Sequence, residues 1–420
     1  MDNPVTDGIW KGMDIRCDIV IVGGGLNGPA LALPLARAGL SVAVIDGQAE
    51  KPRLEDDFDG RSYALALASC RMLEALGLWE NVEDTAQPML EIKVSDGRAG
   101  EGPGPFGLHF DHAEIEEGPM GHMVEDRYLR RALMAAVKAE AGITVLNGCA
   151  VTDQSVTREG VRVDLADGRS CFARLLVGAD GRQSGAAERA GIRRTRFDYG
   201  QTALVCAVEH EKPHGGIAHQ FFLPSGPLAI LPLKGNRSSI VWSEQAEIAA
   251  RIQALPDDAY LAELRPRFGD FLGQVSLAGA RFTYPLNLTI AQSFIGERLA
   301  LVGDAAQGMH PIAGQGLNAG LRDVSALAEV LIEAQRRGED IASPLVLARY
   351  QQWRRFDRAS LALATDLFNR LFSNDNSLLR AARGLGMGVV NALPGLRRSL
   401  IREAAGLTGD LPRLLQGRPI

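Results

Sequence analysis

Residues 18–38 read DIVIVGGGLNGPALALPLARA. The segment begins with a short run of apolar, mostly β-branched residues, which is typical of a buried parallel strand. Three glycines in the spacing Gly-x-Gly-x-x-Gly follow it (Gly23, Gly25 and Gly28), and residues 29–38 suit a helix. A second apolar run over residues 40–46 predicts another strand. Strand, glycine-rich turn, helix and strand within about 30 residues indicate a βαβ unit.

The spacing of the three glycines has a physical purpose in a turn that binds a dinucleotide. The first glycine permits the tight turn, the second lets the backbone approach a pyrophosphate, and the third lets helix and strand pack closely. The N-terminus of the helix then offers free N–H groups and a positive dipole to the phosphates. Asp46 ends the next strand, where a carboxylate can accept both ribose hydroxyls. The segment therefore predicts dinucleotide binding, and it does not separate FAD from NAD.

Two further turns each follow an apolar strand and contain an aspartate. Residues 178–181 read GADG, and residues 303–306 read GDAA. Because ligands of open α/β sheets bind beyond the carboxyl ends of the strands, we predict Asp180 and Asp304 to be binding residues. The second turn continues as HPIAGQGLN over residues 310–318 and leads into a helix, whose N-terminus can stabilise negative charge on a reduced flavin ring. We interpret His310 as a structural residue of this turn rather than a general base.

In this order and at these separations, the three motifs resemble those of the group A flavoprotein aromatic hydroxylases, the relatives of p-hydroxybenzoate hydroxylase. The resemblance implies an α/β fold with a FAD-binding Rossmann-like domain of the glutathione-reductase type, an inserted β-rich substrate domain and a C-terminal helical segment. FAD would be the cofactor and NAD(P)H the co-substrate. The implied division assigns residues 15–90, 111–185 and 286–343 to the FAD-binding domain, 91–110 and 186–285 to the substrate domain, and 344–420 to the helical segment.

The resemblance also implies roles for individual residues at the phosphate end of FAD. Gly23, Gly25 and Gly28 would hold the pyrophosphate, and Asp46 would bind the adenosine ribose. Arg127, in the segment EDRYLRRAL, matches an arginine that reaches the ribityl and phosphate region in the family. For Arg127 an ordinary surface or salt-bridged position stays open.

At the flavin end, Asp304 would hold the ribityl chain and Asp180 would lie between the FAD phosphates and a passing NAD(P)H. Arg61 matches an arginine near the flavin in the family, and for Arg61 too a surface or salt-bridged position stays open. Three residues would give backbone contacts to the isoalloxazine: Gly316, Leu317 and Asn318. The chain departs from the family where Ala187 and Gln307 stand in place of an arginine and a histidine.

Within this family, three segments resemble the ubiquinone-biosynthesis hydroxylases: DGRSYALALAS (59–69), GPLAILPLKGNRSSIVW (226–242) and AGLTGDLPRLLQG (405–417). The likeness implies hydroxylation of a polyprenylated phenol with NAD(P)H and O2 through a flavin C4a-hydroperoxide. The flavin supplies the oxygen transfer, so we name no catalytic acid or base. Two alternatives remain, hydroxylation of a different, soluble aromatic compound and a non-catalytic FAD- or lipid-binding subunit of a quinone-synthesis assembly.

Composition narrows the partners of the chain. Its 420 residues are 46% hydrophobic with a net charge of −6, so we expect no nucleic-acid partner. Five scattered cysteines without a C-x-x-C pair argue against a disulfide framework and against a metal site. We expect no signal peptide and no transmembrane helix, and hence a cytoplasmic protein.

The C-terminal end has a different charge from the rest of the chain. Residues 376–420 contain seven arginines and two acidic residues, with apolar residues near helical spacing. Such a segment suits an anionic membrane surface, which would make the protein peripheral on the inner face of the membrane, or a contact with other quinone-biosynthesis proteins. The alternative, a helix packed on its own domain with solvated arginines, stays open.

The pattern of residues also predicts local structure. We expect helices over residues 62–76 and 126–141, the second with Asp126 as its N-cap, and a loop over residues 97–105. Short antiparallel strands should fill residues 151–177, mostly β structure residues 200–285, and helices the chain from Pro344, broken at Pro394 and Pro412. The substrate cavity should lie between the flavin domain and the sheet face that carries Leu231, Pro232 and Trp242.

Overall fold

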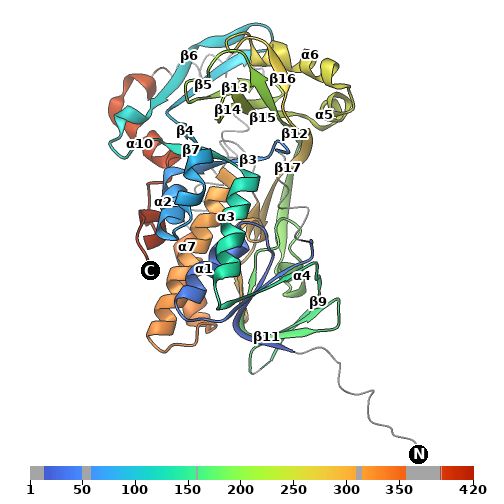
Figure 1. Cartoon of the computed structure of the whole chain (residues 1–420), viewed down its shortest axis with the longest axis vertical. Helices are drawn as coiled ribbons and strands as arrows, with labels where there is room; N and C mark the ends of the chain where they lie inside the picture. The colour runs from blue at the N-terminus through green and yellow to red at the C-terminus, as the bar shows by residue number, and fades with distance from the viewer. Residues whose placement is uncertain (1–13, 50–57, 158, 309–314, 356–387, 389) are drawn as a thin grey trace, which may run out of the picture.

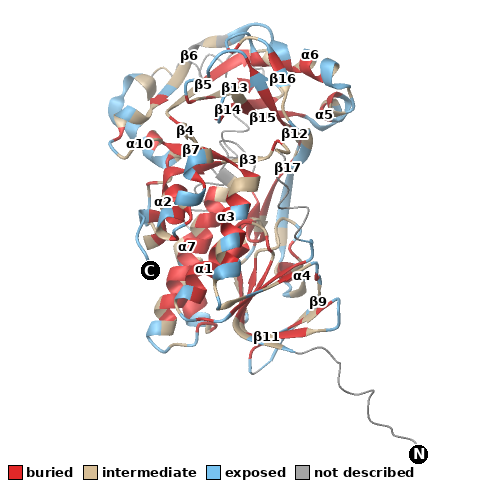
Figure 2. Cartoon of the chain, viewed as in Figure 1, coloured by how far each residue is buried: buried red, intermediate tan, exposed pale blue. Residues whose placement is uncertain are grey.

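Two large β-sheets, one toward each end of the long axis, form the frame of the molecule (Figure 1). The computed structural model describes residues 14–49, 58–157, 159–308, 315–355, 388 and 390–420. His310 and part of the predicted basic C-terminal segment lie outside the described residues. Figure 2 shows that buried residues line the helices beside the lower sheet and the strands of both sheets.

The first sheet has the strand order β18-β19-β11-β1-β2-β8 and is mainly parallel. The parallel strands are β1 (Ile15–Val22), β2 (Val42–Asp46), β8 (Ile143–Asn147), β11 (Ser170–Gly178) and β19 (Leu299–Leu301), with the short β18 (Ile295–Gly296) at the edge. β9 (Val151–Val156) and β10 (Val161–Leu165) extend it as an antiparallel meander, which confirms the strands predicted over 151–177. The α/β fold with a βαβ unit is thereby confirmed, and its first helix is α1 (Asn27–Arg37).

Helices with regularly spaced apolar residues cover this sheet. α1 packs against α3 (Asp126–Ala139) and α7 (Gln315–Arg336), and the three lie side by side in Figure 1. The predicted N-cap of α3 is wrong, since Glu125 is the cap residue and makes no side-chain cap bond. Asp126 lies inside the first turn and pairs with Arg130 at 2.9 Å. Because the carboxylate of Asp126 pairs with Arg130 one turn further along the helix, it does not cap the helix.

The second sheet contains nine strands in the order β20-β17-β12-β15-β14-β13-β5-β6, with β16 beside β12. Its strands are β5 (Glu91–Arg98), β6 (Gly102–Asp111), β12 (Arg194–His210), β13 (Ile217–Leu223), β14 (Gly226–Leu233), β15 (Arg237–Gln245), β16 (Val275–Leu277), β17 (Phe282–Ala291) and β20 (Gln307–Gly308). The loop predicted over 97–105 is wrong, because β5 and β6 form a hairpin that turns at residues 99–101. β17 runs through the domain boundary at 285/286, and the domain division stays a prediction.

Two helices that the sequence did not predict cover part of the outer face of this sheet. α5 (Ala246–Gln253) and α6 (Asp257–Phe268) bury apolar side chains against β12, β14 and β15. Trp242 is fully buried there, 6.3 Å from the ring of Tyr260. The register pairs Leu228 with Trp242 and Leu231 with Ser239, so Trp242 and Leu231 point to opposite faces. The prediction that Trp242 lines the substrate cavity is therefore wrong.

A small third sheet joins the two large ones. It consists of β3 (Ser62–Ala66), β7 (Gly121–Glu125) and β4 (Gln87–Met89), and the helix α2 (Leu67–Ala75) follows β3. The helix predicted over 62–76 is therefore wrong for its first five residues. β3 pairs antiparallel with β7, with Ala64 opposite Met123. This distant partner decides the strand, because a short apolar run fits either a helix or a strand.

The described C-terminal residues pack back on the rest of the chain. Residues 344–355 are helical, and α10 (Pro394–Ala404) begins at Pro394, which suits the first turn of a helix. Arg397 pairs with Glu114 at 2.8 Å, and Arg413 pairs with Glu333 at 2.9 Å. Three of the arginines thus have carboxylate partners in the chain itself, the third being Arg402 with Glu117. None of the helices in the described part of the chain is long and apolar enough to span a membrane.

Candidate functional site

The carboxyl ends of four parallel strands bring the predicted binding residues to one edge of the first sheet. The order β19-β11-β1-β2 places Asp304, Asp180, the glycine turn and Asp46 next to one another in that order. Neighbouring strands lie about 4.8 Å apart, so the row spans roughly 14 Å. An extended dinucleotide can lie along an edge of this length.

The glycine turn is packed so closely that Gly23, Gly24 and Gly28 have no room for a side chain. Gly23 has φ +118°, and a Cβ there would lie 2.3 Å from the backbone oxygen of Ala179 in the GADG turn. A Cβ on Gly28 would lie 2.0 Å from the backbone oxygen of Gly23. Gly25 has nothing within 4 Å of its Cβ position. The turn is thus tightly packed at Gly23 and Gly28 and has free space at Gly25. This space is where the backbone of the turn can approach a pyrophosphate.

Asp46 is buried and holds the glycine turn by hydrogen bonds. Its Oδ2 accepts from the backbone N of Gly24 at 2.6 Å, and its Oδ1 accepts from the backbone N of Gln48 at 2.7 Å. The residue is only 7% exposed. A carboxylate held by backbone N–H groups at the end of β2 is fixed in position, and its contact with a ribose stays a prediction.

Asn27 is a candidate site residue that sequence reasoning missed. It begins α1, and its side chain lies against Gly303 and Gly320, where added Cβ atoms would meet its Nδ2 at 2.2 and 2.5 Å. The Oδ1 of Asn27 is buried and has no hydrogen-bond partner among the described residues. A buried acceptor of this kind calls for a donor that a ligand can supply. The position of Asn27 within the glycine motif was the available signal.

The carboxylate of Asp180, like the side-chain amide of Asn27, is only partly hydrogen-bonded. Its Oδ2 accepts from the backbone N of Ala186 at 3.0 Å, while its Oδ1 is buried without a partner in the described part of the chain. Two orphaned acceptors, an open glycine and a helix N-terminus therefore meet at the edge of one sheet. Hydroxyl donors and a pyrophosphate, the groups that FAD offers, match this set.

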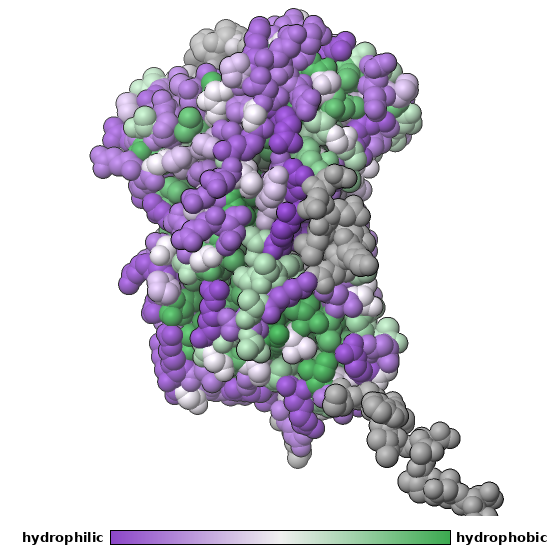
Figure 3. Space-filling model, in the orientation of Figure 1, coloured by the Kyte–Doolittle hydropathy of each residue, from purple (hydrophilic) through white to green (hydrophobic). Residues whose placement is uncertain are grey.

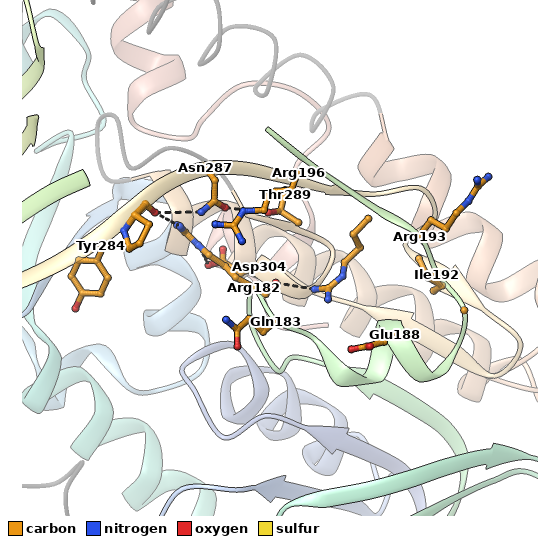
Figure 4. A pocket seen from close by; sticks show the side chains of 13 residues that line it. Arg182, Gln183, Glu188, Ile192, Arg193, Arg196, Tyr284, Asn287, Thr289 and Asp304 are labelled. Carbon is orange, nitrogen blue, oxygen red and sulfur yellow. Dashed lines mark hydrogen bonds and ion pairs between the residues drawn. The ribbon is translucent and has the colours of Figure 1, made fainter. Parts of the chain in front are cut away.

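Asp304 borders a large pocket beside this edge (Figure 4). The pocket has a volume of about 1150 Å³. Arg182, which follows the GADG turn, donates from Nε to Asp304 Oδ2 at 3.1 Å. In Figure 4 these two side chains lie together, with residues of β12 and β17 beside them. The charged residues in the lining are four arginines and two acids: Arg182, Arg193, Arg194, Arg196, Glu188 and Asp304.

The start of α7 is built from Gly316, Leu317 and Asn318. Gly316 and Leu317 are half-buried, and Asn318 is 8% exposed. The side chain of Asn318 is engaged with β3, where its Nδ2 donates to Ala64 O at 2.8 Å. The amide of Asn318 is thus used within the protein, and the backbone contacts predicted for these three residues stay a prediction.

Arg61 and Arg127 lie together with carboxylates near the junction of the sheets. Arg61 is 2.6 Å from Asp59 and 3.8 Å from Asp126, and Arg127 is 2.8 Å from Glu125. Both arginines are thus salt-bridged, which was the open alternative. Their contact with a flavin stays a prediction.

Comparison with known proteins gives the family. The model of the FAD binding domain family matches residues 16–362. A ubiquinone hydroxylase, UbiL, of Rhodospirillum rubrum is 47% identical over 410 residues, which are 97% of this chain and 94% of the relative. The chain belongs to the FAD-dependent ubiquinone hydroxylases. The 3-demethoxyubiquinol 3-hydroxylase of Escherichia coli is 35% identical and covers 93% of this chain and 98% of its own length.

A solved structure confirms the fold of this ubiquinone hydroxylase. The p-nitrophenol 4-monooxygenase PnpA of Pseudomonas putida superposes with a TM-score of 0.79 at 19% identity, covering 94% of this chain and 99% of that one. By the family model and the 47% identical ubiquinone hydroxylase, the protein is a FAD-dependent monooxygenase, with NAD(P)H as the co-substrate typical of its family. No group of three or more potential metal-ligating side chains occurs among the residues that the structure describes.

Proposed function

We propose that this monooxygenase hydroxylates the aromatic ring of a polyprenylated phenol in ubiquinone biosynthesis, using NAD(P)H and O2. The observation that carries the proposal is the 47% identity to a ubiquinone hydroxylase over nearly the whole chain. The row of binding groups at the sheet edge supports it, because each motif falls at the carboxyl end of a strand. FAD, when bound, supplies electron transfer from NAD(P)H and the activation of O2.

The residues that we propose for FAD are those that the fold brings to this edge. Gly23, Gly25 and Gly28 with the start of α1 would bind the pyrophosphate, and Asp46 the ribose. Asp180 and Asp304 would bind the central part of the cofactor. The start of α7 at Gly316, Leu317 and Asn318 would give backbone contacts to the isoalloxazine. Arg61, just before β3, would lie near the flavin, and Arg127, in the first turn of α3, would reach the ribityl and phosphate region.

We propose that the pocket beside Asp304 admits NAD(P)H. Its four arginines exceed its two acids, and NAD(P)H carries two or more phosphate charges. Arg196 is exposed in the lining, opposite Thr289 of β17 in the strand register. Arg196→Ala should raise KM for NAD(P)H roughly tenfold with bound FAD unchanged, since a charged hydrogen bond contributes about 1.5–3 kcal/mol. Arg251→Ala, an exposed arginine of α5, is the control and should leave KM unchanged.

We propose that the substrate binds where the nine-stranded sheet faces the third sheet. Ala64 of β3 and Met123 of β7 form one apolar cluster with Leu233 of β14, and Leu231 packs against it. Apolar walls next to the flavin orient an aromatic ring and exclude water from the reaction. This side replaces the Trp242 face, which α5 and α6 cover.

We also propose that the start of α10 contacts a membrane surface. Leu393 and Leu396, at the start of α10, are 50% and 44% exposed. Figure 3 shows a mainly hydrophilic upper surface on the face that it displays. Because three C-terminal arginines pair with carboxylates of the chain, the two leucines rather than the basic charge should carry the contact. Leu393→Ser with Leu396→Ser should reduce co-flotation with anionic vesicles, and unchanged flotation would rule the contact out.

Deletion of the gene in its host tests the proposed reaction. We expect a prenylphenol that lacks one ring oxygen to accumulate, and mass spectrometry of this precursor identifies the carbon that is hydroxylated. The wild-type gene should restore the quinone. Normal quinone without any precursor, in a host with no second hydroxylase for the step, would contradict the assignment to ubiquinone biosynthesis.

A further inference from the structure

The outer face of the nine-stranded sheet is only partly covered by helices. α5 and α6 pack on β12, β14 and β15, whereas β5 and β6 lie at the other end of the sheet (Figure 1). Between the C-terminal end of α6 and the strands β13, β5 and β6 lies a pocket of about 910 Å³. This volume is within the range of pockets that hold small molecules, roughly 300–1,000 Å³.

Aromatic side chains form one wall of this outer pocket. The rings of Phe268 and Phe271 are stacked 5.5 Å apart, and the ring of His219 lies 4.6 Å from Phe271 and 5.8 Å from Phe221. Phe271 is 40% exposed, although it is a large apolar side chain. Burial lowers the pKa of His219 to about 4, so its ring is neutral near pH 7. The wall thus offers a continuous uncharged aromatic surface.

The floor of the outer pocket contains an unpartnered hydroxyl. Ser95 lies opposite Phe221 in the pairing of β5 with β13, so both side chains point to the same face. On the other side, Ser95 lies opposite Gly107 of β6, which has no side chain to cover it. Ser95 is 9% exposed, and its Oγ is buried without a hydrogen-bond partner in the described part of the chain. A buried hydroxyl of this kind is costly unless a ligand or water bonds to it.

The rim of the outer pocket carries charged side chains of both signs. It carries four cationic side chains and two acidic ones: Lys93, Arg98, Arg265, Arg267, Glu101 and Asp270. Lys93 pairs with Glu91 and Arg267 with Glu263, whereas Arg265 is exposed at the mouth of the pocket. Arg265 can therefore pair with an anionic group of a ligand whose apolar body rests on the phenylalanines.

We propose that this outer pocket is a second ligand site, which binds an aromatic anion with its ring against Phe221 and Phe271 and its charge toward Arg265. Ser95 Oγ would donate to, or accept from, a polar atom of the same molecule. The site lies on the sheet face opposite Leu231, away from the proposed substrate side. The inference is independent of the proposed reaction.

Fluorescence titration of the full-length holoenzyme with 8-anilinonaphthalene sulfonate, an aromatic anion, tests the proposal. The wild type should show saturable binding, and Phe271→Ser and Arg265→Gln should each weaken it roughly tenfold without loss of bound FAD. Leu345→Ser, which changes a leucine that is 79% exposed elsewhere, is the matched control and should not alter the affinity. Unchanged affinity in both pocket variants, or an equal loss in the control, would overturn the proposal.

Ser95→Ala separates a ligand role from a structural one. Removal of an unpartnered buried hydroxyl should raise the melting temperature of the ligand-free protein, because the desolvation cost disappears. The same variant should bind the probe several-fold more weakly, since its hydrogen bond is lost. A melting temperature and an affinity that both stay at the wild-type value would contradict the assignment of Ser95 to the site.

Discussion

Asn318 joins the start of α7 to β3 through both polar atoms of its side chain. Its Nδ2 donates to Ala64 O at 2.8 Å, and its Oδ1 accepts from Ala66 N at 2.9 Å and from Ser69 Oγ at 2.8 Å. The residues are buried and lie about 250 positions apart in the chain. One amide therefore fixes the helix start that faces the proposed flavin ring to the edge of the third sheet.

Asn318→Ala should destabilise the protein and loosen FAD. The substitution leaves Ala64 O and Ala66 N without their partner, and each unsatisfied buried group costs about 1–3 kcal/mol. Urea unfolding should show the loss in the free energy of unfolding, and dialysis should show lower FAD retention. Leu345→Ala, at an exposed position, is the control. Wild-type stability and FAD retention in Asn318→Ala would show that the amide does not hold the helix start.

The two glycines of the phosphate turn should respond differently to alanine. Gly28→Ala places a Cβ 2.0 Å from Gly23 O, so the turn must open and the protein should unfold more easily or fail to fold. Gly25→Ala meets nothing within 4 Å and should fold normally. If the pyrophosphate approaches Gly25, the variant should nevertheless bind FAD at least tenfold more weakly, as flavin fluorescence quenching measures. Equal FAD affinity in Gly25→Ala and wild type would place the pyrophosphate elsewhere.

Asp323 and Arg354 form a buried ion pair that supports the GDAA turn. Arg354 Nε is 2.9 Å from Asp323 Oδ1, and Asp323 Oδ2 accepts from Gly303 N at 2.8 Å. Arg354→Met should cost roughly 3–5 kcal/mol of stability, because it removes a cation that pairs with a buried carboxylate. The double variant with Asp323→Asn keeps an acceptor for Gly303 and should recover part of the loss. Denaturant midpoints compare them, and a double variant less stable than Arg354→Met would refute the ion-pair explanation.

His122 should make stability fall in acid. The pKa of His122 is lowered from the ordinary value of 6.5 to about 4. Burial of the ring is the main cause, and the positive charge of Lys234 is the second. The unfolded chain therefore binds the proton more readily, so the stabilising contribution is complete above pH 6.5 and is lost as the pH falls toward about 4. We expect roughly 1–3 kcal/mol from this group. His122→Gln should flatten the dependence of unfolding free energy on pH in this window, and an unchanged slope would exclude His122 as its source.

The residues at the sheet edge could be predicted from sequence because each depends on local signals. Apolar strands followed by glycine turns predicted where Asp46, Asp180 and Asp304 would lie, since the carboxyl ends of parallel strands share one edge. Their detailed bonding was not predictable. Asp304 pairs with Arg182, and Asn27 fills the space at Gly303, through contacts between separate strands.

The failures have long-range causes. Residues 62–66 form a strand because β7 and Asn318 satisfy their backbone groups, and no local pattern reports such partners. α6 was missed because it contains Pro266 and lies between segments that form strands of the second sheet. The basic C-terminal charge is reduced by Glu114 and Glu117, which lie about 280 positions earlier in the chain.

Oxygen incorporation by the purified holoenzyme examines the proposed reaction itself. The protein, with FAD bound, is incubated with NAD(P)H, a polyprenylated phenol in detergent and dioxygen labelled with the heavy isotope, and the product is analysed by mass spectrometry. We predict a product with one labelled oxygen on the aromatic ring, formed only when NAD(P)H is present and lost in Gly25→Ala. NAD(P)H oxidation without labelled product, for every prenylphenol supplied, would contradict ring hydroxylation of this substrate class.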